Sequence, residues 1–249
     1  MLARHSRALG EAKPQKWQPE RLLLLGHGTS LVGMMPLPLG PVGSPLRLLC
    51  LGAHCDDIEI GCGGTLLRLL RERPGSTVTW VVFASNEARR VEAQRSAAAY
   101  LTSVADARVE IYQFRESYFP FAASDIKDRF EQLKGQVTPD VVFSHRAEDM
   151  HQDHRVIAEL TWNTFRNNLI LQYEIPKYEG DLGTPNVFVP LERATAERKV
   201  ELLLEHFPSQ ASRTWFHPDT FHGLMTVRGV ECNAPERRAE AFYARKLVI

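Results

Sequence analysis

The sequence predicts an α/β fold, in which a Rossmann-like, mostly parallel sheet carries helices on both faces. One observation is that short apolar segments of strand length alternate along the chain with segments of helical character. Another is that two of these strands, 46–53 and 141–144, are each followed by a cluster of histidine and carboxylate side chains. Because ligands bind beyond the carboxyl ends of the strands in such sheets, both clusters are expected at one edge.

The individual elements follow from the apolar pattern and from turn-forming residues. Strands are expected at 46–53, 77–84, 109–112, 141–144, 169–173 and 187–189. Helices are expected in the leucine-rich stretch after Gly64 and at 87–101, 124–134, 155–166 and 195–206. The tail, 207–249, is less regular. Residues 1–45 are expected to form an irregular N-terminal extension, and residues 46–249 a single domain.

The composition argues against several classes of protein, among them nucleic-acid-binding and membrane proteins. The 249 residues are 44% hydrophobic and 24% charged, and 30 basic side chains balance 30 acidic ones. A chain without net charge offers no electrostatic footprint for nucleic acid or for an anionic membrane surface. No apolar run reaches the roughly 18 residues of a membrane span. The apolar stretch 21–36 is a poor signal peptide, because Gly26-His27-Gly28-Thr29 interrupts it.

Cysteine usage indicates the compartment. Four cysteines, Cys50, Cys55, Cys62 and Cys232, are too few for a secreted disulfide scaffold, and three of them lie in one stretch. We expect reduced thiols in a cytoplasmic enzyme, with Cys55 and Cys62 as small buried side chains. His27, between two glycines, is expected to be an ordinary loop histidine.

The two polar clusters have the composition of a catalytic metal site. His54 and Asp57, three residues apart in a tight turn, can bind one ion, and His154 from the second cluster can supply a third ligand. Catalytic zinc takes three such ligands and leaves one position for water. Zn²⁺ is therefore the expected cofactor, with Fe²⁺ as the other candidate.

Two polar side chains then remain beside the metal. Asp56 is expected to take the proton from the activated water. His151, as imidazolium, is expected to stabilise the oxyanion or to protonate the leaving amine. Asp153 is expected to orient His151, as carboxylates do for catalytic histidines.

Other interpretations use the same residues. His-x-Asp-Asp alone could be a surface loop or a helix cap, and Asp153 lies where it could cap the helix that follows. A dinucleotide site is disfavoured, because Gly61, Gly63 and Gly64 do not match G-x-G-x-x-G and Asp56 and Asp57 would repel a pyrophosphate. We expect these glycines to form a close-packed turn leading into the first helix.

Two motifs stand in order along the chain: AHCDDIE at 53–59 and HQDH at 151–154. Shorter segments, such as 61–66, 89–92 and 239–242, extend the pattern over about residues 46–246. Together they resemble the PIG-L/LmbE family of zinc-dependent N-acetylglucosamine deacetylases, whose motifs are Ala-His-Pro-Asp-Asp-Glu and His-x-x-His.

The resemblance implies a role for individual residues. It makes His54, Asp57 and His154 the zinc ligands, Asp56 the general base and His151 the electrophilic or acid partner. Arg89 matches a position associated with substrate binding. The chain departs from the family where Cys55 replaces proline and where Ile58 takes the place of glutamate, with Glu59 following. Neither change removes a ligand or the base, so we expect an active enzyme and leave the substrate open.

The function expected is hydrolysis of an acetamide on an N-acetylated amino sugar or sugar conjugate. The candidate substrate contacts have charged or polar side chains, some of them aromatic: Arg89, Arg115, Tyr118, Glu174, Lys177 and Asn186. Packing within a loop explains the aromatic ones equally well. The alternatives are hydrolysis of a thiol-conjugate amide or a phosphoester, and a sugar-binding protein without activity. Whether copies of the chain associate into a homo-oligomer stays open.

Overall fold

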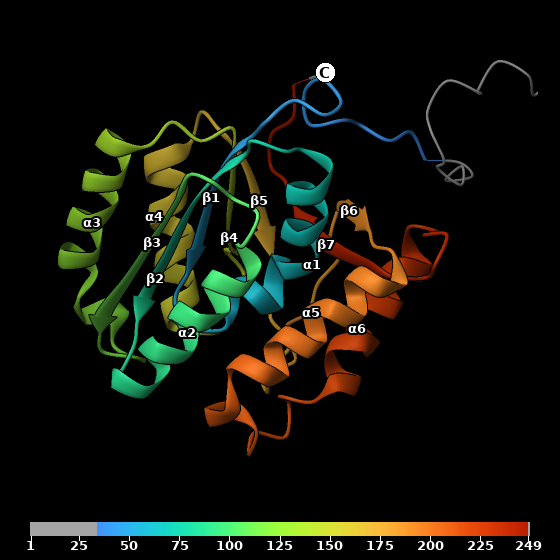
Figure 1. Cartoon of the computed structure of the whole chain (residues 1–249). Helices are drawn as coiled ribbons and strands as arrows, with labels where there is room; N and C mark the ends of the chain where they lie inside the picture. Colours follow the sequence, from blue (N-terminus) through green and yellow to red (C-terminus); the bar gives the residue numbers. More distant parts are fainter. Residues whose placement is uncertain (1–33, 249) are drawn as a thin grey trace, which may run out of the picture. The chain divides into compact units, whose positions relative to one another are not determined.

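A seven-stranded sheet, in the order β3-β2-β1-β4-β5-β7-β6, forms the centre of the computed structural model, which describes residues 34–248 (Figure 1). The strands are β1 (Arg47–Gly52), β2 (Thr77–Ala84), β3 (Ala107–Phe114), β4 (Val141–His145), β5 (Leu169–Tyr173), β6 (Val187–Pro190) and β7 (Ala239–Tyr243). The five strands β3, β2, β1, β4 and β5 are parallel, and β7 runs antiparallel to both of its neighbours, β5 and β6. The predicted α/β fold with a mostly parallel sheet is confirmed.

Helices cover both faces of this sheet (Figure 1). They are α1 (Asp57–Glu72), α2 (Glu87–Tyr100), α3 (Ala123–Gln136), α4 (Gln152–Phe165), α5 (Arg193–His206) and α6 (Pro218–Glu231), with short 3-10 turns η2 (Phe119–Phe121) and η3 (Pro208–Gln210). Within β1, Leu49 and Leu51 pack with residues of α3 and α4, whereas Leu48 and Cys50 pack with residues of the other helices. Burial on both faces explains why this strand is a continuous apolar run.

The strand order reverses between β1 and β4. From β1 the chain turns into α1 on one face, and from β4 it turns into α4 on the other. In doubly wound sheets this switch point leaves a crevice at the carboxyl ends of the two strands. The two polar clusters of the sequence follow β1 and β4, so the fold brings them to the same crevice.

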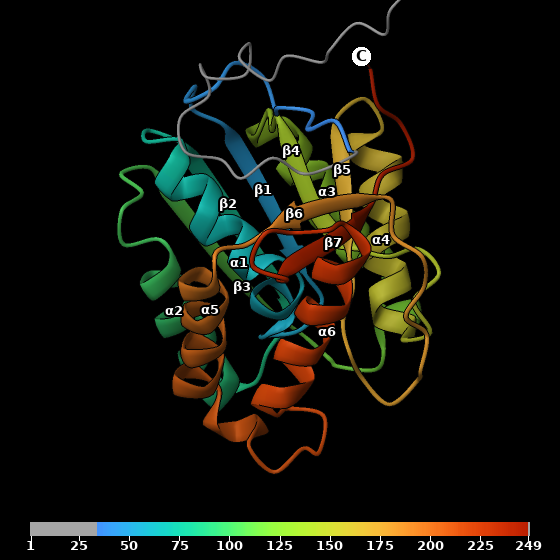
Figure 2. The same ribbon diagram turned by 90° about the vertical axis from the view of Figure 1, so that its right-hand side faces the viewer.

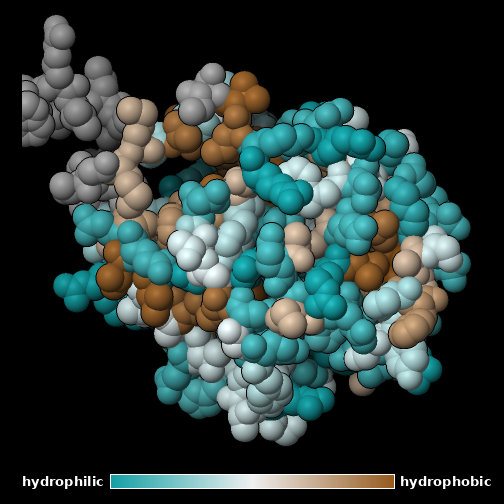
Figure 3. Space-filling model, turned by 180° about the vertical axis from the view of Figure 1, so that it is seen from behind, coloured by the Kyte–Doolittle hydropathy of each residue, from teal (hydrophilic) through white to brown (hydrophobic). Residues whose placement is uncertain are grey.

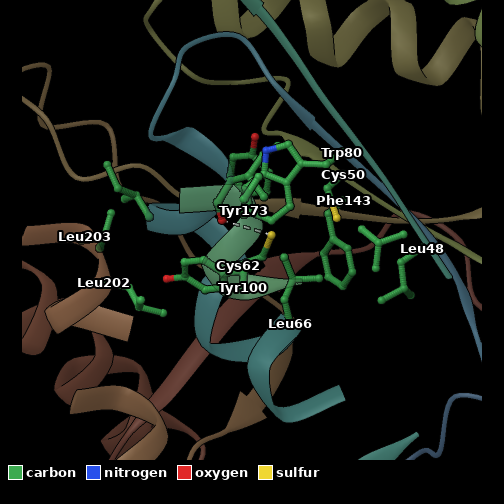
Figure 4. Packing of buried hydrophobic residues seen from close by; sticks show 14 of the residues in the cluster. Leu48, Cys50, Cys62, Leu66, Trp80, Tyr100, Phe143, Tyr173, Leu202 and Leu203 are labelled. Carbon is green, nitrogen blue, oxygen red and sulfur yellow. Dashed lines mark hydrogen bonds between the residues drawn. The ribbon is translucent and has the colours of Figure 1, made fainter. Parts of the chain in front are cut away.

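The glycines after the first cluster lie inside α1, and the prediction that they form a turn before it is wrong. Side chains press against the helix at the points where a Cβ atom would stand. A Cβ on Gly61 would lie 2.2 Å from the ring of Tyr173, and one on Gly63 would lie 2.7 Å from the hydroxyl of Tyr100. Figure 4 shows both tyrosines in the core around α1, close to Cys62.

A buried ion pair also contacts α1. The Glu240 carboxylate accepts hydrogen bonds from the backbone amides of Gly64 and Thr65, at 2.9 and 2.6 Å. Lys199 donates to the same carboxylate and to the Ile60 carbonyl, both at 2.6 Å. Each buried charge therefore has several partners, and the pair joins α5 and β7 to the helix that begins at the site.

The tail contains two elements that the sequence pattern did not predict, α6 and β7. Glycines at 223 and 229 lower the intrinsic helix propensity of α6, although His217 and Pro218 are good residues for its start. The strand β7, with the sequence AEAFY, has modest strand propensity and forms because it pairs with both β5 and β6. Figure 2 shows α6 beside α5, next to these strands.

The segment 34–45 has no regular helix or strand, as expected, and it packs on the body. Arg73 donates to the carbonyls of Pro41 and Ser44, at 3.1 and 2.9 Å. His27 lies outside the described residues, and the boundary at residue 45 stays a prediction. Within residues 34–248, no helix combines the length and apolar character needed to cross a bilayer. On the face drawn in Figure 3, hydrophobic side chains form separate patches among hydrophilic ones.

Substitution of Gly61 tests the packing that supports the site. We expect Gly61→Ala to lower the free energy of unfolding by about 1–3 kcal/mol or more, because the new methyl group overlaps the fully buried Tyr173 ring. Gly223→Ala in α6 is the control, since nothing lies within 4 Å of its Cβ position. The control should gain up to about 1 kcal/mol. Urea denaturation measures both, and equal stability of the two variants would contradict this packing.

Candidate active site

The first half of the site is the turn between β1 and α1. The backbone amide of His54 donates to Oδ2 of Asp57 at 2.6 Å, which fixes the two side chains relative to each other. Asp57 begins α1, where the helix dipole favours a negative charge. Both side chains are buried, so the sequence spacing His-x-x-Asp becomes a rigid pair.

The second half is the start of α4. His151 caps this helix, because its Nδ1 accepts the backbone amide of Asp153 at 3.3 Å. In turn, the His151 amide donates to Oδ1 of Asp149 at 2.7 Å. Asp153 and His154 then lie in the first turn of α4, and both are buried. The helix cap that the alternative interpretation assigned to Asp153 is thus made by His151.

The three predicted ligands lie close together between these halves. Nδ1 of His54 lies 3.1 Å from Nε2 of His154. Oδ2 of Asp57 lies 3.4 Å from the first nitrogen, and its other oxygen, Oδ1, lies 3.5 Å from the second. Neighbouring ligands around a tetrahedral ion with bonds of about 2.0–2.1 Å stand about 3.3 Å apart. The spacing of the two imidazole nitrogens therefore fits one small divalent cation, with the Asp57 carboxylate beside it. Among the described residues, two groups have ligand atoms that all lie within 4.8 Å of one another: His54, His151 and His154, and Asp57, His145 and His154.

Carboxylates behind the two imidazoles fix their tautomers. Nε2 of His54 lies 3.1 Å from Oδ2 of Asp153, and Nδ1 of His154 lies 3.0 Å from Oδ2 of Asp149. With protons on these outer nitrogens, His54 Nδ1 and His154 Nε2 face each other and are the nitrogens left to bind an ion. Such carboxylate–histidine pairs are typical of metal sites, so the donor set fits a metal in its chemistry as well as its spacing.

Burial and neighbouring charges shift the pKa values of these groups in opposite directions. Burial lowers the pKa of His54, but Asp57, Asp153 and Glu116 together raise it to about 10. Burial, with a contribution from His145, lowers the pKa of His154 to about 3. Although burial raises the pKa of Asp57, the surrounding imidazoles hold it well below its usual range. Asp57 and His154 are thus in the protonation states that metal ligation requires.

Asp56 stands beside the three ligands with one oxygen free. Its Oδ1 accepts a hydrogen bond from Nη2 of Arg89 at 2.7 Å. Its Oδ2 is buried and has no hydrogen-bond partner among the described residues. Burial raises the pKa of Asp56. Arg89 lies in the first turn of α2, where its backbone amide donates to the cap residue Asn86.

His151 lies over the same centre. Its ring centroid is 4.8 Å from that of His54 and 4.6 Å from that of His154. Burial and the charge of His54 lower the pKa of His151, so the neutral form prevails at neutral pH. This corrects the expectation of an imidazolium. Because Nδ1 accepts a backbone hydrogen bond, the proton of the neutral ring is on Nε2.

Asp153 has different partners from the one expected. Its carboxylate contacts His54 and also accepts the backbone amides of Ser117 and Phe119, at 2.6 and 3.1 Å. The expectation that it orients the His151 ring is therefore corrected. It instead orients a predicted metal ligand and anchors the loop between β3 and η2. Ser117 adopts a left-handed conformation, with φ of 66°, and its carbonyl accepts from Gln152.

Two further site residues were missed in the sequence. Asp149 holds His154 and also accepts from Lys177 at 3.0 Å. His145, the last residue of β4, is fully buried with Nε2 3.1 Å from Oδ2 of Asp57. The signal for Asp149 was its position two residues before the second motif. For His145 it was a histidine directly after a predicted strand end.

The predicted substrate contacts separate into two groups. Arg115 and Tyr118 are exposed on the loop that Asp153 anchors, and the guanidinium of Arg115 lies 3.5 Å from the centroid of the Tyr118 ring. Glu174 is buried, with both carboxylate oxygens bound to Arg228 at 2.7 and 2.8 Å. Tyr243 donates to Glu174 as well, at 3.0 Å. Glu174 therefore has a structural role, joining Arg228 and Tyr243, and has no free oxygen for a substrate.

The remaining candidates are also occupied by contacts within the protein. Lys177 is largely buried and pairs with Asp149 and Asp181. Asn186 hydrogen-bonds the backbone of Ala244 through both its amide nitrogen and its oxygen. Cys55 is buried with its thiol directed to the Ala84 carbonyl, 3.3 Å away, and burial raises its pKa, so the thiol is unreactive.

Comparison with known proteins shows which family the central part of the chain resembles. Residues 49–165 match the sequence model of the family described as PIG-L: GlcNAc-PI de-N-acetylase. This range contains both motifs, and with them His54, Asp57 and His154. The chain is also similar to the uncharacterized deacetylase YaiS of Escherichia coli K12, which is 29% identical over 141 residues; these are 52% of this chain and 74% of the relative.

Solved structures share the fold across most of the chain. The conserved protein TT1542 of Thermus thermophilus has a TM-score of 0.62 at 18% identity, covering 82% of this chain and 96% of its own. N,N'-diacetylchitobiose deacetylase of Pyrococcus horikoshii has a TM-score of 0.60 at 19% identity, and the match covers 86% of this chain and 88% of that protein. GalB, the 4-carboxy-2-hydroxymuconate hydratase of Pseudomonas putida KT2440, has a TM-score of 0.65 at 17% identity, and the match covers 82% of this chain and 98% of that protein. At these identities the likeness establishes the fold.

The buried carboxyl at the end of the first motif, that of Glu59, gives a test of pH dependence. Burial raises the pKa of Glu59 to about 8, and its carboxylate accepts from Ser96 at 2.6 Å. A raised carboxyl pKa stabilises the folded state at low pH, and this contribution is lost as pH rises from about 4.5 to about 8. We expect wild-type protein to lose stability over this range relative to Glu59→Gln, by a few kcal/mol in order of magnitude. Denaturation in the presence of a chelator at pH 5, 7 and 9 measures the free energy of unfolding of both proteins. If it changes with pH by the same amount in the wild type and in Glu59→Gln, the prediction is wrong.

Proposed function

We propose that the protein is a metal-dependent hydrolase that removes the acetyl group from an N-acetylated amino sugar or sugar conjugate, releasing acetate and a free amine. The family description and the deacetylase relatives support the reaction class. The observation that carries the proposal is the free, buried Oδ2 of Asp56 beside the convergent nitrogens of His54 and His154. A purely structural metal site has no use for an unpartnered carboxylate.

The proposed ligands are His54, Asp57 and His154. A divalent cation held there would polarise the acyl oxygen and lower the pKa of a bound water to about 7. Asp56, fixed through Oδ1 by Arg89, presents Oδ2 to take a proton from the attacking water. The water oxygen forms a bond to the acyl carbon while this proton passes to Asp56.

The second half of the reaction uses the same carboxyl. Neutral His151 donates an Nε2–H hydrogen bond to the oxygen that gains negative charge, which needs no imidazolium. The C–N bond then breaks, and the protonated Asp56 returns its proton to the leaving nitrogen. Because its pKa is raised, Asp56 holds this proton long enough to deliver it, as an exposed aspartate would not. Acetate and the free amine are the products.

The sugar is proposed to lie against the loop anchored by Asp153. Arg115 and Tyr118 are exposed there, and Phe121 is 82% exposed on the adjoining turn. Aromatic rings suit the apolar face of a pyranose, and the guanidinium suits its hydroxyl groups. Arg89 is proposed to position the base and to contact the substrate from α2. Glu174 is not a proposed substrate contact, because Arg228 binds both of its carboxylate oxygens.

Fold alone does not decide the reaction, since a hydratase and a deacetylase share it. Amide hydrolysis is favoured over a phosphoester because Asp149 and Asp153 are engaged by histidines, so no second carboxylate-rich set is free among the described residues of the site for a two-metal centre. Zn²⁺ is the first candidate and Fe²⁺ the second. The cytoplasm is the proposed compartment, supported by four buried, unpaired thiols.

Removal of the proposed base tests the mechanism. We expect Asp56→Asn to lower kcat for acetate release by about 10²–10⁴-fold while metal content stays unchanged. Acetate is measured from N-acetylglucosamine and N,N'-diacetylchitobiose with protein loaded in turn with Zn²⁺, Fe²⁺ or Co²⁺. Asp219→Asn, an exposed carboxylate on α6, is the control and should keep full activity. Undiminished turnover by the Asp56 variant would refute the assigned base.

Proton release on metal binding tests the proposed ligands separately. Burial lowers the pKa of His54, but its carboxylate neighbours raise it to about 10, so the ring carries a proton at neutral pH that an ion must displace. We expect the apparent association constant for Zn²⁺ to rise by about tenfold per pH unit between pH 6 and 8. Calorimetry in two buffers of different ionisation enthalpy should detect about one proton released per ion. An affinity independent of pH would contradict ligation by His54.

A further inference from the structure

Lys177 lies in the loop that follows the carboxyl end of β5, the strand next to β4. Its side chain is only 8% exposed, and a charge in such a place needs partners. Its Nζ lies 3.0 Å from Oδ2 of Asp149 and 2.8 Å from each carboxylate oxygen of Asp181. An ammonium group has three donors, and these three oxygens accept them. Lys177 therefore has no donor left for a substrate.

Asp149 connects this ammonium group to both histidines of the second motif. Its Oδ2 accepts from Lys177 and also lies 3.0 Å from Nδ1 of His154. Its Oδ1 accepts the backbone amide of His151 at 2.7 Å. Because the Asp149 side chain is buried and each oxygen has a partner, a rotation of this carboxylate would disturb both histidines.

Asp181 holds the same part of the chain through further contacts. Its Oδ2 accepts the backbone amide of Met150 at 2.7 Å, and its carbonyl accepts from the guanidinium of Arg146 at 2.6 Å. The loop between β5 and β6 is thus attached to the segment before α4 by Lys177 and by Asp181. The ammonium group also lies between two largely buried carboxylates, which would repel each other without it.

We propose that Lys177 is a positioning residue for the metal centre: its ammonium group holds the Asp149 carboxylate, through which His154 is oriented. Through its other oxygen the same carboxylate supports the cap formed by His151. The proposal rests on the function proposed above, because it concerns the same ligand. The loop after β5 then contributes to the metal centre without supplying a ligand. A substrate contact by Lys177 would instead leave metal binding unchanged.

Variants of Lys177 isolate this contact. Lys177→Met keeps most of the side-chain volume and removes the charge, whereas Lys177→Arg restores a cation that can bind carboxylates. Lys177→Gln keeps a hydrogen-bond donor without the charge. Lys127→Met is the matched control, because it removes a lysine on α3 whose partner, Glu131, is exposed.

The readout is the binding of Zn²⁺ and Co²⁺ alone to the full chain. Competition with a chromogenic chelator gives the dissociation constant, and the visible absorption of bound Co²⁺ reports the ligand geometry. We expect Lys177→Met to weaken Zn²⁺ binding by about tenfold and to alter the Co²⁺ spectrum, as loss of an outer partner does at other metal sites. Lys177→Arg should recover part of the affinity, and Lys127→Met should bind as the wild type does.

A double-mutant cycle tests whether Lys177 acts through Asp149. By itself, Asp149→Asn is expected to weaken Zn²⁺ binding by about 10–100-fold. In that background Lys177→Met should cause much less than its own loss, because the ion pair that it removes is already gone. If the two losses simply multiply, Lys177 acts by another route and the proposal is wrong.

Wild-type affinity and an unchanged Co²⁺ spectrum in Lys177→Met would also overturn the proposal. If that variant does not fold, as judged by circular dichroism, Lys177→Gln decides the question by the same criteria.

His154→Ala distinguishes this failure from failure of the proposed function. If that variant also binds Zn²⁺ as tightly as the wild type, the metal centre itself is wrong. If it loses the metal while Lys177→Met keeps it, the metal centre stands and the positioning role alone is refuted.

Discussion

Two imidazole nitrogens, on His54 and His154, face each other at 3.1 Å in a buried part of the protein. Each has its outer nitrogen bound to a carboxylate, so both inner nitrogens point at the same place. Lone pairs at this distance repel unless a proton or a cation lies between them. The rest of the structure can be understood as what holds this contact in place. The turn after β1 and the cap of α4 set its two sides, and Asp57 supplies a third.

The contact depends on the order of the strands. His54 and His154 are far apart in sequence, but β1 and β4 are neighbours at the point where the sheet order reverses. The helices that follow these strands leave toward opposite faces, which opens the space that the ligands fill. The strands that carry the site are almost completely buried. Its geometry is therefore set by a stiff core.

The sequence was sufficient to predict that His54, Asp57 and His154 meet, because each follows a strand and the parallel sheet fixes where strand ends lie. It was not sufficient for the partners of Asp153, since a side chain in the first turn of a helix can point to several neighbours. The glycines of α1 were misjudged because the reason for them is Tyr173, which is distant in sequence. His145 was missed because a strand-end histidine looks the same whether it binds a substrate, a metal or another side chain. The strand β7 owes its existence to pairing on both sides, which local pattern does not encode.

One carboxylate, that of Asp153, holds both His54 and the loop that carries Arg115 and Tyr118. The loop proposed to contact the substrate and the proposed ligand His54 therefore depend on the same side chain. A replacement loop of different length would release the Ser117 and Phe119 amides and leave His54 less firmly held. Evolution of a new specificity on this scaffold is therefore constrained to changes that keep the backbone of this loop and alter only its side chains. Engineering by loop exchange would meet the same restriction, whereas substitution at the exposed tips would not.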